Sequence, residues 1–381
     1  MPRFPSPLWL LGLHIFLVPA AAAFEAPDIA GYWAGHINYR GADLAVGIEF
    51  APGDPPQSAN LDIPPLVYAR QPIALNWEHN QPQIELPFGI GAFDLELTEA
   101  GELAAVRAGF DLRLRRSERV RRRAQDLAFG AFEPSLTGTL YLPEPEQQYP
   151  LVVLISGSGA ANRSQWSYAS WVEFYLGLNF GVFVYDRRPD LAPLPDGSIA
   201  GIEHHAQDVV QVIEQLRQIP GVDDSRIGLV GASRGAWISL AASQAVPDVR
   251  FLVLTSAAGI TPAEQEIISV LGRMARDGLD AEARAQARNY LRLYFYVAQS
   301  GQGWELLRSA MAAAEGAGWF AYVDQPRSLE DLRWWRANMN FGPTEYLHTV
   351  KAPVLALWGG ADVITPGAQQ QRIIEAALAA G

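Results

Sequence analysis

A five-residue segment has the residue types and spacing of an activated serine. Residues 231–235 read Gly-Ala-Ser-Arg-Gly and follow the apolar run 227–230. A sharp turn from a strand into a helix would hold Ser233 in a strained backbone conformation and present its hydroxyl at the edge of a sheet. Side chains in place of Gly231 or Gly235 would collide with neighbouring backbone in such a turn. The segment predicts a serine nucleophile, and the alternative is a purely structural turn.

Backbone amides that could receive negative charge are expected at two places near this serine. Residues 156–159 read Ser-Gly-Ser-Gly and directly follow the apolar run 151–155. We expect the N–H groups of Ser158 and Arg234 to form an oxyanion hole, aided by the positive end of the helix after Ser233. The glycine segment lacks the Gly-x-x-x-x-Gly-Lys pattern, so a phosphate-binding loop is excluded. The alternative is an ordinary glycine-rich turn.

A carboxylate is expected at the same edge of the sheet. Asp362 follows the apolar run 353–358. A carboxylate at the carboxyl end of a strand can hold an imidazole in the tautomer that accepts a proton from serine. Asp362 is therefore the expected acid of a serine triad, and the alternative is a simple turn residue.

The elements that must position these residues follow an α/β pattern. Apolar runs that alternate with helical stretches predict a mostly parallel sheet with helices on both faces. These runs are 151–155, 182–185, 227–230, 251–254 and 353–357. Residues 261–346 interrupt the pattern with aromatic-rich helical sequence. We expect a helical cap there, which is either a lid over the site or an ordinary packed insertion.

Three further parts are expected before this pattern. Residues 1–23 combine a basic start, a short apolar run and small residues up to Ala23, the form of a cleaved secretory signal peptide. Alternating apolar and polar residues over 24–115 predict a small antiparallel β domain. The arginine-rich residues 116–133 predict a solvated linker. We therefore expect a secreted or periplasmic protein without a stable membrane span after signal cleavage.

Composition excludes several classes of function. The net charge of −12 argues against sequence-independent binding of nucleic acid. The chain has no cysteine, so disulfides, thiolate metal sites and a cysteine nucleophile are excluded. Lys351 is the only lysine, which excludes a lysine Schiff base. His36 and His79 stand alone without a second ligand at metal spacing. We expect no metal and no organic cofactor.

Residues 134–381 resemble the α/β-hydrolase superfamily. More narrowly, they resemble secreted serine esterases with an N-terminal β domain, a group described as serine aminopeptidase-like or dienelactone-hydrolase-like. The resemblance lies in residues 136–140, 156–159 with Arg163, 185–187, 231–235, and 353–355 with Asp362. Two positions depart from the family pattern: Ser156 stands where a histidine is usual, and Arg188-Pro189 replaces Arg-Gly.

The resemblance implies a hydrolase that cleaves carboxylic esters through an acyl-enzyme on Ser233, with Asp362 as the acid. The expected partner is a small-molecule ester. A serine peptidase acting on short peptides at the same site is one alternative. A non-catalytic binding protein that keeps the fold and the pocket is another.

One required residue of such a hydrolase has no candidate. The family order is serine, aspartate, histidine, and no histidine follows Asp362. We expect His204 and His205 to cap a helix or to face solvent, and His348 to lie at the opposite edge of the sheet. The other histidines are His14, His36 and His79. We therefore predict a C-terminally truncated hydrolase that lacks its catalytic histidine, has little esterase activity and exposes one edge of its sheet.

Overall fold

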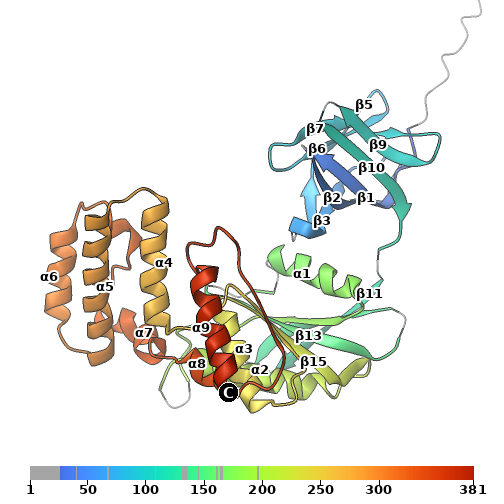
Figure 1. The fold of residues 1–381 in the computed structure, drawn as a ribbon. Coiled ribbons are helices and arrows are strands. Elements are labelled where there is room, and N and C mark those ends of the chain that lie inside the picture. Colours follow the sequence, from blue (N-terminus) through green and yellow to red (C-terminus); the bar gives the residue numbers. More distant parts are fainter. Residues whose placement is uncertain are drawn as a thin grey trace, which may run out of the picture. The chain divides into compact units, whose positions relative to one another are not determined.

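The computed structural model describes residues 26–381 except for 40, 67, 108, 120, 131–134, 145, 160, 161, 164, 165, 195 and 196. The predicted signal peptide lies outside the described residues. The chain divides into two compact units (Figure 1). The first comprises the described residues up to Leu61 together with Pro72–Ser117, and the second comprises Asp62–Gln71 and Glu118–Gly381. No helix among the described residues is long and apolar enough to span a membrane.

Antiparallel strands form most of the chain before residue 118, as the alternating pattern predicts. One sheet has the order β4-β3-β2-β1-β10-β9-β8, and another has the order β5-β6-β7. Phe110, Leu112 and Leu114 alternate as buried residues of β10. The elements are β1 (Gly31–Tyr39), β2 (Ala42–Phe50), β3 (Ala59–Ile63), η1 (Pro64–Leu66), β4 (Tyr68–Ile73), β5 (Leu75–Glu78), β6 (Gln81–Leu86), β7 (Gly91–Asp94), β8 (Glu96–Leu97), β9 (Glu102–Arg107) and β10 (Phe110–Ser117).

The sheet of the second unit is mostly parallel, as expected. Its order is β11-β12-β14-β13-β15-β16-β17. The strands are β11 (Arg122–Phe129), β12 (Leu136–Pro143), β13 (Tyr149–Ile155), β14 (Gly181–Tyr185), β15 (Val222–Ala232), β16 (Leu252–Thr255) and β17 (Val354–Leu357). The pairs β14–β13, β13–β15, β15–β16 and β16–β17 are parallel. β12 runs antiparallel to both of its neighbours, β11 and β14. The carboxyl ends of the parallel strands therefore meet at one edge, where the predicted site residues lie.

Part of the predicted linker is instead a strand. β11 lies within 116–133 and pairs antiparallel with β12. The linker prediction rested on the run of arginines, but an edge strand tolerates charged side chains because its backbone still pairs on one side. These arginines also have acidic partners: Arg122 pairs with Glu173, and Arg123 pairs with Glu146. A high density of arginines therefore does not by itself identify a solvated linker.

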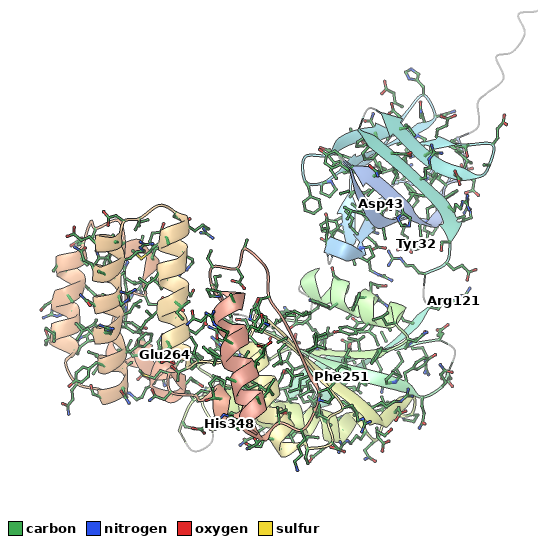
Figure 2. All side chains as sticks on the ribbon, in the orientation of Figure 1. Tyr32, Asp43, Arg121, Phe251, Glu264 and His348 are labelled. Carbon is green, nitrogen blue, oxygen red and sulfur yellow. The ribbon has the colours of Figure 1, made fainter. Side chains whose placement is uncertain are left out.

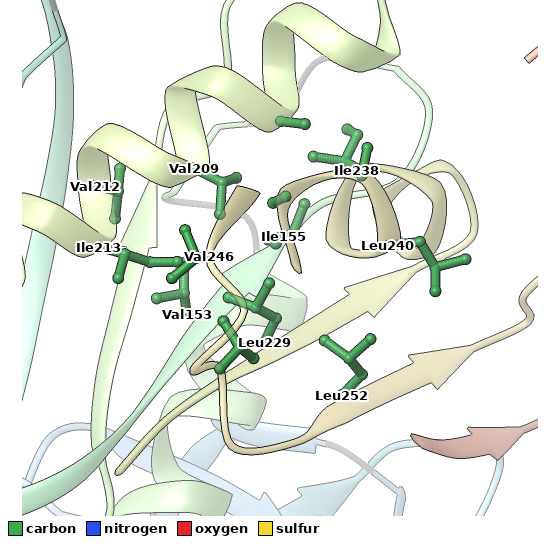
Figure 3. Packing of buried hydrophobic residues seen from close by; sticks show 14 of the residues in the cluster. Val153, Ile155, Val209, Val212, Ile213, Leu229, Ile238, Leu240, Val246 and Leu252 are labelled. Atoms are coloured by element: carbon green, nitrogen blue, oxygen red, sulfur yellow. The ribbon is translucent and has the colours of Figure 1, made fainter. Parts of the chain in front are cut away.

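Helices cover both faces of the parallel sheet. Val153 and Ile155 of β13 belong to the core on one face, together with residues of α2 and α3 (Figure 3). Residues of α9 belong to the same core. Val152 and Leu154, the alternate residues of the same strand, pack against α1 on the other face. A strand buried on both sides explains why the run 151–155 is continuously apolar. The helices are α1 (Trp166–Gly177), α2 (Ile202–Leu216), α3 (Arg234–Ala245) and α9 (Gly367–Ala380).

The predicted helical cap lies between β16 and β17 and has a hydrophobic core of its own. Its aromatic residues Tyr290, Tyr294, Phe295 and Trp319 are buried in that core. The aromatic-rich sequence therefore packs a folded insertion, and its role as a lid stays a prediction. The cap elements are α4 (Pro262–Arg276), α5 (Ala281–Ser300), α6 (Trp304–Ala314), η2 (Phe320–Tyr322), η3 (Leu329–Leu332), α7 (Arg333–Asn338) and α8 (Pro343–Thr349).

One outer strand of the sheet exposes apolar side chains. Among the described residues, β17 has a neighbour on one side only. Its Leu355 and Leu357 are 53% and 45% exposed. The predicted exposed sheet edge is therefore present, and such an edge is a template for pairing with another strand.

The first prediction concerns Glu266 in the cap. Burial raises the pKa of its carboxyl group to about 7, with Asp324 adding to the rise and Arg273 opposing it. Because this pKa lies above the unfolded value, the contribution of Glu266 to stability is lost as the pH rises from about 4.5 to about 7. We expect Glu266→Gln to raise the thermal midpoint at pH 8 but not at pH 4. The exposed Glu144→Gln serves as control, and an equal shift at both pH values would contradict the prediction.

Candidate active site

Ser233 occupies the strained turn that the sequence predicts. It lies between β15 and α3 with φ 53° and ψ −118°, and its residue is exposed. Its N–H donates to the carbonyl of Thr255 at 2.8 Å, and its carbonyl accepts from the N–H of Ala236 at 2.9 Å. A non-glycine residue with positive φ persists only where its surroundings hold it. The turn presents Ser233 at the carboxyl edge of the parallel sheet.

The two glycines of the motif have the steric role that the sequence predicts. A Cβ atom on Gly231 would lie 2.3 Å from the carbonyl oxygen of Gly235. A Cβ atom on Gly235 would lie 2.2 Å from the carbonyl oxygen of Ile155. Both distances are far below van der Waals contact. The backbone of β13 therefore approaches the first turn of α3 so closely that only glycine fits.

The glycine-rich loop after β13 lies against Ser233. A Cβ atom on Gly157 would be 3.1 Å from the carbonyl oxygen of Ala232 and 3.3 Å from Cβ of Ser233. Ser158, the next residue, is exposed, and Arg234 directly follows Ser233 at the start of α3. The loop of Ser158 and the N-terminus of α3 therefore both adjoin Ser233. The assignment of these two N–H groups as oxyanion donors stays a prediction.

Arg187 binds the glycine-rich loop of residues 156–159. Its guanidinium donates to the carbonyl of Gly157 at 3.3 Å and to that of Gly159 at 2.9 Å. It also donates to Oγ of Ser156 at 3.4 Å. The Arg187 side chain is only 2% exposed. Ser156, which departs from the family pattern, thus contacts an arginine of the motif after β14.

A cluster of buried charges connects Arg187 with the nucleophile turn. Asp190 pairs with both Arg187 and Arg234, and its Oδ2 lies 2.6 Å from Nη1 of Arg234. The guanidinium of Arg234 also stacks on the ring of Trp334 in α7, at 4.3 Å from the ring centroid. Burial alone would raise the pKa of Asp190, but interactions with His205, Arg234 and Arg187 outweigh it and hold the pKa well below its usual range. Asp190 therefore keeps its negative charge at neutral and mildly acidic pH.

Sequence reasoning missed Asp190 and Trp334. Asp190 ends the stretch Asp-Arg-Arg-Pro-Asp, residues 186–190, which directly follows a buried strand. Such a density of charge at the carboxyl end of a strand was an available signal. Nothing in the sequence pairs Trp334 with Arg234, because the two residues are 100 positions apart and meet only through packing of the cap.

Asp362 is fixed at the end of the neighbouring strands. Its Oδ2 accepts a hydrogen bond from Oγ of Ser256 at 2.9 Å. Its Oδ1 accepts from the N–H groups of Ile364 and Thr365, both at 2.9 Å. Ser256 directly follows Thr255, whose carbonyl binds the N–H of Ser233. The predicted acid therefore lies at the same sheet edge as the predicted nucleophile.

A family model for the alpha/beta hydrolase family matches residues 152–380. The chain belongs to this family. The matched residues include the nucleophile turn, the glycine loop, the charged cluster and Asp362. No curated protein matches the sequence of this α/β hydrolase.

Solved structures of similar fold include hydrolases of several kinds. An esterase from Pyrococcus furiosus has 14% identity, a TM-score of 0.43, and a match covering 68% of this chain and 78% of that chain. A carboxyl esterase from Tuber melanosporum has 17% identity, a TM-score of 0.39, and coverage of 69% and 73%. An acylaminoacyl peptidase from Pyrococcus horikoshii has 13% identity, a TM-score of 0.42, and coverage of 92% and 48%. These values support no inference about activity.

The second unit of this α/β hydrolase contains His204, His205 and His348. His204 accepts a hydrogen bond from the N–H of Gly201 at 3.4 Å, so the expected helix-capping role is confirmed. His205 is not at a solvent-exposed helix end: it is 1% exposed and lies 3.1 Å from Arg187 within the charged cluster. His348 lies on α8, which precedes the amino end of β17 (Figure 2). Within the described part of the chain, none of their hydrogen bonds or ion pairs reaches Ser233 or Asp362.

The close backbone approach makes a prediction for Gly235. Gly235→Ala is expected to lower the free energy of unfolding by about 1–3 kcal/mol, because the added Cβ would collide with the backbone of Ile155. Urea unfolding of the second unit would measure the loss. Gly177→Ala in α1 is the control, since an added Cβ there meets nothing within 4 Å. Equal stability of the two variants would contradict the steric argument.

The charged cluster makes a second prediction for this site. Asp190→Asn leaves Arg187 and Arg234 without their shared carboxylate, and loss of one partner from a buried charge pair is strongly destabilising. We expect faster amide hydrogen exchange in peptides covering 155–159 and 232–236. The control is Asp223→Asn, which removes the partner of Arg226 at the amino end of β15. Unchanged exchange at both segments in Asp190→Asn would refute the proposed support.

Proposed function

We propose that this α/β hydrolase is a serine hydrolase that cleaves carboxylic esters through an acyl-enzyme on Ser233. One observation carries the proposal. Ser233 is exposed in a left-handed turn at the head of α3, where Gly231 and Gly235 allow a backbone approach that no other residue permits. Such a turn stores strain, and strain of this kind is found where a side chain must be presented for chemistry.

In the proposed reaction, Oγ of Ser233 forms a bond to the carbonyl carbon of the ester. The N–H groups of Ser158 and Arg234 receive the negative charge on the carbonyl oxygen. The bond to the alcohol oxygen then breaks, the alcohol leaves with a proton, and water hydrolyses the acyl-enzyme. Solvent water would carry the hydroxyl proton of Ser233 to the leaving alcohol, slowly, because no described histidine contacts Ser233 or Asp362. Asp362 would orient an imidazole if one lay beside it.

Proton transfer limits the expected rate. Since no described histidine contacts Ser233 or Asp362, we expect slow turnover by residues 1–381. Removing the histidine of such a triad typically lowers kcat by about 10⁶, while oxyanion stabilisation and binding preserve a residual about 10³–10⁴ over water. A reactive probe that acylates or phosphonylates serine is therefore a better first assay than steady-state turnover.

The absence of a contact between any described histidine and Ser233 or Asp362 favours a second candidate, a non-catalytic binding protein that retains the site. In that case the pocket would bind its ligand while Ser233 stays unreactive. The pattern of residues 1–23 supports export, so we propose that either protein acts outside the cytoplasm.

The test is covalent labelling with a fluorophosphonate. We expect the wild-type protein to be labelled and Ser233→Ala to be unlabelled, as measured by intact mass. Ser225→Ala, an exposed serine at the amino end of β15, should be labelled like the wild type. Labelling that persists in Ser233→Ala would remove Ser233 from the mechanism. A wild type that is not labelled would favour the binding protein. A separate comparison of aminoacyl amides with esters as substrates would reveal a peptidase.

A further inference from the structure

A small cavity adjoins Ser233 at the carboxyl edge of the sheet. Its volume is about 180 Å³, and all of its lining residues belong to the second unit. Gly157, Ala232 and Thr255 line it. All three neighbour Ser233: Ala232 precedes it, Thr255 accepts its N–H at 2.8 Å, and a Cβ on Gly157 would lie 3.3 Å from its Cβ. The cavity therefore lies beside the turn that carries Ser233.

The walls of the cavity are mostly apolar, with Ser156 and Thr255 as polar members. Leu154 of β13 and Val230 of β15 contribute from the sheet, and Tyr168 and Trp171 contribute from α1. Leu154 and Val230 are 3% and 6% exposed, so they are parts of a packed layer rather than mobile surface groups. Trp171 is held in turn by the neighbouring ring of Tyr175 at 6.1 Å. A preformed apolar cavity of this kind suits a hydrocarbon chain or a single ring.

The volume limits what can enter. A water molecule occupies about 30 Å³ in the liquid, so 180 Å³ has room for about six atoms of that size. We propose that this cavity binds the acyl part of the ester and restricts it to about six carbon atoms, with Trp171 and Val230 setting the length. This inference rests on the proposed function, because it takes Ser233 as the point of attachment.

A second cavity provides the contrast. It measures about 600 Å³ and lies between α7 and the start of α2. Its lining includes the polar residues Arg333, Asn338, Glu203 and His204, together with Phe341. Gly157, Ala232 and Thr255, which join the small cavity to Ser233, do not line this second cavity. Although it is larger, this polar cavity is a poor site for an acyl chain, since a hydrocarbon chain would strip water from its polar groups without replacing their hydrogen bonds.

The test compares p-nitrophenyl esters of two to twelve acyl carbons, with the burst of p-nitrophenolate as the measure of acylation. We expect the wild type to react best with the butanoate or hexanoate and at least about tenfold more slowly with the decanoate. Trp171→Ala enlarges the cavity and should raise the decanoate-to-butanoate ratio about tenfold. Val230→Leu fills it and should shift the preference to acetate. Phe341→Ala enlarges the other cavity and should leave the ratio unchanged.

The outcomes separate this inference from the proposed function. If esters acylate Ser233 but the ratio responds to Phe341→Ala and not to Trp171→Ala or Val230→Leu, the acyl-site assignment fails while the function stands. If no ester reacts, calorimetric titration with hexanoate tests the cavity alone. Binding to the wild type that Val230→Leu abolishes would keep the cavity assignment without the hydrolase. Binding that Val230→Leu does not change, or no binding, would overturn it.

Discussion

The close approach of three backbone segments beneath Ser233 is the constraint on which the site depends. The end of β15 lies so close to the first turn of α3 that a Cβ atom is excluded at Gly231, and the end of β13 lies so close to that turn that one is excluded at Gly235. This contact forces the left-handed backbone of Ser233 and brings Gly157 beside it. Because a packed interior deforms little, a strained turn can persist only where its neighbours are equally well placed.

The buried charges extend that constraint from the turn to its surroundings. Asp190 joins the arginine that holds the glycine loop to the arginine that begins α3. The stacking of Arg234 on Trp334 links the same cluster to α7 of the cap. Displacement of the cap would remove the ring on which Arg234 stacks, and displacement of the loop would remove two carbonyl acceptors of Arg187. A single ionic cluster thus couples the loop, the nucleophile turn and the cap.

Hydrogen bonds hold the carboxylate of Asp362 in one orientation. Three hydrogen bonds fix its carboxylate, two to Oδ1 and one to Oδ2. An ionised carboxylate has about four acceptor positions, so one position on Oδ2 remains for a further donor. An imidazole at that position would have its orientation set by a rigid acceptor. The Asp362 carboxylate is therefore fixed by groups of its own surroundings.

The sequence by itself determined the features that depend on neighbours along the chain. The Gly-x-Ser-x-Gly turn, the buried strand 151–155 and the alternation in β10 follow from local sterics and from periodicity, and each is confirmed. Only the tertiary structure decided the roles of the arginines and of His205. Whether an arginine is a solvated linker residue or a partner of Glu173 depends on which helix packs beside it. The Asp190 cluster and the small cavity likewise arise where segments distant in sequence converge, and no local pattern encodes their distances.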